Sequence, residues 1–135
     1  MTFVLDACAV LALLRKEPGC LKVRDLLADG GNECLIHAVN LCEVYYDCLR
    51  SYGEESAEQM LGGVLAAGLV LRDDMDVHFW KGAGKLKAAG RISLADTFAV
   101  MLAARDGATL VTSDHHEFDP LLKEGNFPVK VQFIR

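Results

Sequence analysis

Four carboxylates stand where a chain of this pattern can bring them together. Asp6 directly follows the apolar run FVL, and Asp114 follows TLVT by one residue. Glu43 and Asp96 lie in the opening turns of two apolar helical segments, which begin with VNLCEV and ISLADTF. In an open parallel sheet, the carboxyl ends of the strands and the amino ends of the following helices share one edge, where sites form. We therefore expect all four acids at the same edge.

Each of these acids also has a purely structural interpretation. In NLCE and SLAD the first residue can cap a helix, and the acid three positions later can complete a capping box. A carboxylate there also suits the positive end of the helix dipole. Asp6 and Asp114 can likewise be turn or cap residues. For each acid alone the structural role is the simpler one, so a chemical role depends on the four together.

The surroundings of the acids favour a metal ion. The helix after Asp96 is apolar on nearly all sides, and Asp6 follows an equally apolar strand, so neither should face open solvent. Like charges in a partly buried cleft raise one another's pKa values unless a cation joins them. Oxygen ligands without a histidine pair suit Mg²⁺, or Mn²⁺ in its place, better than zinc. Such ions activate water and stabilise charge on an attacked phosphate, which indicates phosphoryl-transfer chemistry.

The elements that must position these acids follow from the hydrophobic pattern. Short apolar or alternating runs predict five strands, near residues 3–5, 34–36, 69–71, 109–112 and 129–133. Helical patterns fall between them, at about residues 20–28, 41–52, 55–67, 76–89 and 93–105. This alternation predicts one α/β domain over residues 1–135, with a mostly parallel central sheet of about five short strands flanked by helices on both faces.

Composition narrows the partners and the compartment. The net charge of −5 argues against a protein that grips nucleic acid over its whole surface, although a local basic patch can still do so. The opening stretch TFVLDACAVLALL has no basic leader and is interrupted by Asp6, so we expect no signal peptide. Its uncharged run, residues 7–14, is far shorter than the roughly 20 residues of a membrane-spanning helix. We expect a cytoplasmic protein that does not enter a membrane.

The cysteines form an odd set without a close CxxC pair: Cys8, Cys20, Cys34, Cys42 and Cys48. Most lie in apolar runs, so we expect buried, reduced thiols. A zinc site from Cys34, His37 and Cys42 is the sharper alternative, but it lacks a second ligand pair.

With the four acids in place, the sequence resembles the PIN-domain ribonucleases, and among them the VapC toxins of toxin–antitoxin pairs. The most specific part is GRISLADTFAVMLAARDGATLVTSDHHEFD, residues 90–119, in which an acid-bearing helix precedes a strand ending in T-x-D and a nearby Phe. VLDACAVLALL and VNLCEVYY resemble the first and second acid motifs of the family.

The resemblance implies roles for individual residues. Asp6, Glu43, Asp96 and Asp114 match the catalytic, metal-binding acids, and Thr112 matches a polar residue that supports the last of them. It also implies a Mg²⁺-dependent endoribonuclease, a homodimer and a cognate antitoxin that occludes the site. Two alternatives stay open: a housekeeping RNA-processing nuclease with this fold, and a catalytically silent binding module.

The chain departs from the family pattern in two places. Many relatives have a hydroxyl residue just after the first aspartate, where this chain has Ala7 and Cys8. Many place a fifth acid before the Phe, where this chain has Glu117, with Asp119 after the Phe. Either acid can help through water, but we leave both outside the core set.

One segment offers a basic surface for RNA. From Val77 to Ala95 there is no acidic residue, and the four basic residues are Lys81, Lys85, Lys87 and Arg91. We expect these residues to contact the RNA backbone, with a solvated helix face as the equal alternative.

Histidines and aromatic residues near these segments receive structural roles. His115 and His116 follow Asp114 and are expected in a loop, because a metal-bound water needs no histidine base. Phe79, Trp80 and Tyr45 fit core or dimer packing better than base stacking.

Overall fold

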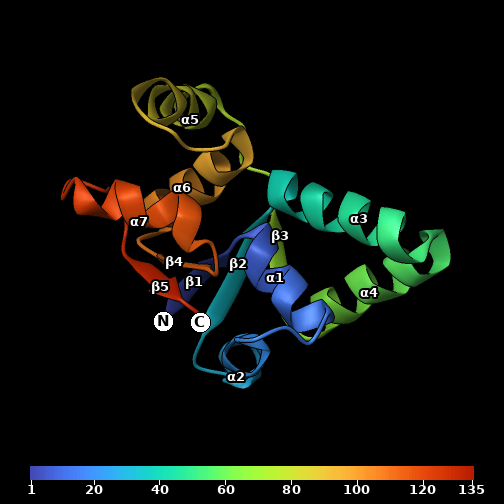
Figure 1. The fold of residues 1–135 in the computed structure, drawn as a ribbon. Coiled ribbons are helices and arrows are strands. Elements are labelled where there is room, and N and C mark those ends of the chain that lie inside the picture. Colours follow the sequence, from blue (N-terminus) through green and yellow to red (C-terminus); the bar gives the residue numbers. More distant parts are fainter.

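The computed structural model describes residues 1–135, and its centre is a single sheet of five strands. The strands are β1 (Thr2–Leu5), β2 (Glu33–His37), β3 (Leu69–Arg72), β4 (Thr109–Thr112) and β5 (Val131–Phe133). They lie in the order β3-β2-β1-β4-β5, and every neighbouring pair is parallel (Figure 1). All five predicted strands and the predicted parallel sheet are confirmed.

Seven helices connect and cover the strands. They are α1 (Ala7–Leu14), α2 (Cys20–Ala28), α3 (Ala38–Tyr52), α4 (Glu54–Ala66), α5 (Val77–Ala89), α6 (Leu94–Asp106) and α7 (His115–Lys123). The five predicted helices are confirmed to within a few residues at their ends. The sequence patterns did not predict α1 and α7. His115 and His116 therefore begin a helix, and their expected loop position is wrong.

The sheet has a hydrophobic core on each face, because alternate residues of a strand point in opposite directions. In β1, Phe3 and Leu5 join a core with residues of α1 to α4, whereas Val4 joins a core with residues of α5, α6 and α7. Figure 1 shows the second group of helices gathered on one side and the α3–α4 pair extending away on the other. The prediction of helices on both faces is confirmed.

Helix α6 is the central element of its layer. It contacts α3, α5, β1, β2 and β4, and its residues 97–100 are all buried. Gly82 of α5 allows close approach to it, since a Cβ atom at Gly82 would lie 2.3 Å from the methyl carbon of Met101. The buried setting expected for this helix is confirmed.

The cysteines and the proposed zinc ligands are not arranged as expected. All five cysteines are free; Cys34 and Cys48 are buried, but Cys8 and Cys42 are exposed, so the expected general burial is wrong. Nδ1 of His37 accepts a hydrogen bond from the Val39 N–H at 3.1 Å, and Nε2 lies 2.8 Å from the Asp74 carbonyl oxygen. Both ring nitrogens are thus engaged, which argues against the zinc alternative.

The helices were also compared with the dimensions of a bilayer. None of the seven combines the length and the apolar character needed to cross a membrane.

Candidate metal centre

Asp6 forms the floor of the candidate site at the carboxyl end of the central strand β1. It is the N-cap of α1, where Oδ1 accepts a hydrogen bond from the Ala9 N–H at 2.9 Å. The residue is 1% exposed, and its Oδ2 has no hydrogen-bond partner. Burial raises the pKa of Asp6 to about 7, and the Thr112 hydroxyl and the Ala9 N–H only partly oppose this rise. A buried carboxylate oxygen without a partner is costly, unless a cation contacts it.

Asp114 enters from the neighbouring strand β4. It is the N-cap of α7, and its Oδ1 accepts a hydrogen bond from the Glu117 N–H at 3.0 Å. The buried Thr112 at the end of β4 orders this turn, since its Oγ1 accepts a hydrogen bond from the Asp114 N–H at 3.0 Å. Thr112 therefore contacts Asp114 through the backbone and approaches Asp6 through its hydroxyl.

Asp96 enters from the first turn of α6, as expected. Ser93 caps this helix and accepts a hydrogen bond from the Asp96 N–H at 3.2 Å. The other half of the capping box is not made by Asp96, because the Ser93 N–H donates to Glu117 of α7. The Asp96 carboxylate is therefore not needed to satisfy the helix start and is available to the site.

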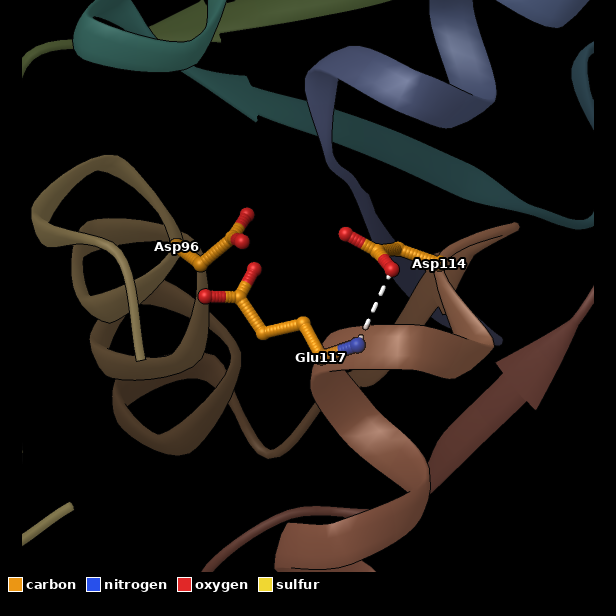
Figure 2. Close-up of side chains that lie close together, drawn as sticks. All are labelled: Asp96, Asp114 and Glu117. Atoms are coloured by element: carbon orange, nitrogen blue, oxygen red, sulfur yellow. Dashed lines mark hydrogen bonds between the residues drawn. The ribbon is translucent and has the colours of Figure 1, made fainter. Parts of the chain in front are cut away.

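Three carboxylates meet above Asp6 and are called the acid cluster below: Asp96, Asp114 and Glu117. One oxygen from each lies within 4.8 Å of the others. Figure 2 shows these side chains converging from α6 and from the start of α7. Burial, followed by a hydrogen bond to Glu117, raises the pKa of Asp96 well above its usual range. Without a cation, Asp96 and Glu117 thus retain a proton at neutral pH.

Glu117 belongs to this cluster by position, although the sequence left it outside the core set. A signal for it was present, because Asp114 and Glu117 have the D-x-x-E spacing of a helix start. Asp119 stays outside the cluster and lies 3.1 Å from His115.

Glu43 lies at the edge of the site. Helix α3 begins at Ala38 with His37 as its N-cap, so Glu43 falls beyond the first turn, and its expected place there is wrong. Asn40, the expected cap, is buried within the helix and donates from Nδ2 to the Ala95 carbonyl oxygen at 3.3 Å. Partial burial and the charge of Glu117 raise the pKa of Glu43, so its carboxylate shares the negative field.

Cys8 stands in the same field. Partial burial raises the pKa of its thiol to about 12, and the charges of Asp6, Asp114, Asp96 and Glu43 add to the effect. The thiol therefore stays protonated, and it offers no cation to balance the acids.

The donor set fits a hard divalent cation. All the converging donors are carboxylate oxygens, and no lysine or arginine forms an ion pair with Asp6, Glu43 or the acid cluster. Mg²⁺ and Mn²⁺ prefer such oxygen ligands. The unpartnered Oδ2 of Asp6 is an independent sign that the site is completed by a cation.

The basic segment lies beside this site. Lys81 and Lys85 are exposed on α5, and Arg91 follows that helix and forms no ion pair or hydrogen bond. Lys87 differs, because its Nζ donates to the Ile92 carbonyl oxygen at 2.7 Å. Of the aromatic residues in this segment, Phe79 is fully buried and Trp80 is 46% exposed.

Comparison with known families places this geometry in context. The family model described as the PIN domain matches residues 3–120. No curated protein matches the sequence.

Several solved structures have a similar fold. The chain is similar to VapBC2 of Rickettsia felis bound to a promoter DNA fragment, with 21% identity, 98% coverage of both chains and a TM-score of 0.74. It is also similar to DNA-bound VapBC of Salmonella typhimurium, with 18% identity, coverage of 100% of this chain and 99% of that one, and a TM-score of 0.75. VapC20 of Mycobacterium tuberculosis, described as a toxin that cleaves the sarcin-ricin loop, has 14% identity, coverage of 93% and 95%, and a TM-score of 0.68.

Proposed function

The chain belongs to the PIN domain family, and on this premise we propose that it is a Mg²⁺-dependent endoribonuclease that acts as the toxin of a toxin–antitoxin pair. The family and the similar fold of VapC structures support a nuclease. The observation that carries the proposal is a set of converging carboxylates, with a buried unpartnered oxygen and no cation of the protein beside it.

In this proposal Asp96, Asp114 and Glu117 hold the ion, with Asp6 beneath them and Glu43 at the edge. The Ala9 N–H and the turn at Thr112 fix Asp6 and Asp114 before substrate arrives. Mg²⁺, or Mn²⁺ in its place, activates water and offsets charge on the attacked phosphate when bound. The proton held by Asp96 and Glu117 leaves when the ion binds, so the site exchanges a proton for a metal.

The basic segment is proposed to guide the RNA backbone. Lys81, Lys85 and Arg91 leave their charges exposed to solvent, whereas Lys87 is partly engaged with the chain. We expect the double change Lys85→Glu and Arg91→Glu to weaken RNA binding and to flatten its dependence on salt, because phosphate contacts release counterions. Fluorescence anisotropy across a salt series measures both effects. Unchanged binding would assign the segment to a solvated helix face.

The proposal also includes a protein partner and a compartment. Similar solved chains are described as toxin–antitoxin complexes, which supports a cognate antitoxin that occludes this site. We also propose a homodimer, and a cytoplasmic location where RNA is present and the free cysteines stay reduced. Growth arrest on expression, relieved by a co-expressed small partner, separates the toxin from a housekeeping RNA-processing nuclease.

The deciding experiment is cleavage of a mixed RNA pool by the purified protein, with Mg²⁺ or with EDTA. Asp6→Asn and Asp96→Asn should abolish cleavage while the protein remains folded by circular dichroism. Asp73→Asn is the matched control, since Asp73 is exposed and has no ion pair. Cleavage that persists in EDTA or in both site variants would refute the metal mechanism. A folded protein that binds RNA or a protein partner without cleaving would instead be the silent binding module.

A further inference from the structure

A continuous hollow leads away from the acid cluster, between α7 and the turn that joins α5 to α6. Its first part has a volume of about 610 Å³ and is lined by Asp114 and Glu117, together with Arg91 and His116. A second part of about 230 Å³ shares four wall residues with the first: Ala89, Gly90, Leu121 and Glu124. The hollow therefore opens onto the candidate metal centre at one end and closes against the loop after α7 at the other.

The two parts differ in chemistry. The part beside the metal centre contains the exposed guanidinium of Arg91, which has no partner in the structure. The far part has an apolar floor and walls, made of Leu86, Ile92, Leu121, Phe127 and Pro128. The edge-to-face contact of Phe127 with the buried Phe118, at 6.0 Å between ring centroids, holds one of these walls in place.

Two polar side chains complete the far part, Glu124 and Asn126. An ionised carboxylate only accepts hydrogen bonds, while an amide both donates and accepts. Apolar walls that cover a flat ring, with a few polar groups that meet its edge, are the features by which proteins hold an unstacked nucleobase. The position of Arg91 between these walls and the acids suits the phosphate attached to such a base.

We propose that this hollow binds the nucleobase adjacent to the scissile phosphate and selects a base that carries an amino group. This inference rests on the proposed ribonuclease function and adds a specificity site to it. The apolar walls hold the ring, Arg91 contacts the phosphate, and Glu124 accepts a hydrogen bond from the amino group. Adenine, guanine and cytosine have such a group and uracil does not, so uracil is disfavoured at this one position.

Gly90 allows the hollow to be filled without touching the acids. Its backbone is extended (φ −153°, ψ 177°), and an added Cβ atom would lie 3.5 Å from Cδ2 of Leu121, an ordinary contact. Gly90→Leu thus fills the passage shared by the two parts. Gly62→Leu is the matched control, because Gly62 lies on the distant α4 with nothing within 4 Å of an added Cβ atom.

The first measurement is sequencing of the RNA ends that the protein produces from a randomised single-stranded pool with Mg²⁺. Wild type and Gly62→Leu should show the same exclusion of uracil at one position beside the cut. Gly90→Leu should lose at least about tenfold of that discrimination, the range of a good hydrogen-bonded base contact. Glu124→Gln, an exposed change, should readmit uracil by a similar factor, because the amide can donate to the uracil carbonyl oxygen.

The second measurement is binding of labelled oligonucleotides, differing only at that position, to the Asp6→Asn protein. Gly90→Leu in this background should remove the difference in affinity between the amino-bearing base and uracil. If wild type cleaves no RNA, the proposed function fails and the inference fails with it. If wild type cleaves but its preference is absent, or is unchanged in both Gly90→Leu and Glu124→Gln, only the inference is overturned. Loss of antitoxin binding in Gly90→Leu with an unchanged base preference would assign the hollow to the protein partner and also overturn it.

Discussion

Two groups of acids at the strand ends balance their charge in different ways. One is the acid cluster with Asp6 beneath it, which has no cation. The other, called the arginine-clamped cluster, follows β3 and consists of Arg72, Asp74, Asp76, Arg105 and Asp106. Both bring three or more carboxylates together, so the difference lies in what neutralises them.

The arginine-clamped cluster is complete within the chain. Nε and Nη2 of Arg72 donate to the two carboxylate oxygens of Asp74 at 2.9 Å each, and its Nη1 donates to Asp106 at 2.6 Å. The Arg72 side chain lowers the pKa of Asp74 to about 2, whereas burial raises the pKa of Asp6 to about 7. Acids with opposite pKa shifts in one small fold indicate different purposes: the first group holds the loop before α5, and the second is prepared for a cation from solution.

The largest expected effect comes from giving the acid cluster a cation of its own. Cys8→Arg introduces a guanidinium among the acids that act on the Cys8 thiol. We expect cleavage to fall about 100-fold or more, the usual cost of losing one strong electrostatic contact in an active site. Initial rates across a Mg²⁺ series check this, with Cys42→Arg as the control at the other exposed cysteine. Equal rates for both variants would mean that the missing cation is unimportant.

The next effect concerns stability without metal. The native protein keeps a proton on Asp6 up to about pH 7, whereas the unfolded chain releases it near pH 4. Unfolding therefore releases a proton in this range, so this group lowers the free energy of unfolding as pH rises from about 4 to about 7. Asp6→Asn removes this dependence and should stabilise the metal-free protein by about 3 kcal/mol at pH 8.

Urea unfolding at pH 5 and pH 8 in EDTA tests this prediction. The gain for Asp6→Asn should be large at pH 8 and small at pH 5, and Mg²⁺ should reduce it by stabilising only the wild type. Asp25→Asn, an exposed acid paired with Arg24, is the control. A gain that does not change with pH would contradict a charge-based origin.

The opposite sign is expected in the arginine-clamped cluster. Arg72→Met leaves Asp74 and Asp106, whose side chains are 13% and 20% exposed, without their main partner. We expect a loss of about 2 kcal/mol in the free energy of unfolding at pH 7, less than for a fully buried pair because these groups keep some solvent. The loss should shrink as the pH falls through the lowered pKa of Asp74, near 2. Denaturant titrations at pH 7 and pH 3 measure it.

Much of this fold was predictable because its strands have clear local patterns. All five are short apolar or alternating runs, and five helices have recognisable periodicity or ends. The run ACAVLALL of α1 failed this test, since a short, wholly apolar segment has no polar face to reveal its period. In α7, the polar start DHHE and Pro120 within the helix concealed the hydrophobic face.

The site was predictable in part for a related reason. Asp6 and Asp114 follow strands, so their place depends only on the order of local elements. Glu43 was misplaced because α3 begins earlier, with the unusual cap His37. The contact between Glu117 and the start of α6 joins residues 24 positions apart, which no local pattern records.

The smallest expected effect distinguishes the two acids on either side of Phe118. Glu117 lies in the acid cluster, whereas Asp119 lies beside His115, which stacks on Phe133 at 3.8 Å between ring centroids. Glu117→Gln should weaken Mg²⁺ binding about tenfold, in the range for a residue that ligates or orients at a metal site. Asp119→Asn should change it less than twofold, because Asp119 is about half exposed and directed away from the cluster. Calorimetric titration with Mg²⁺ compares the variants directly, and equal weakening by both would show that total charge, rather than position in the cluster, sets the affinity.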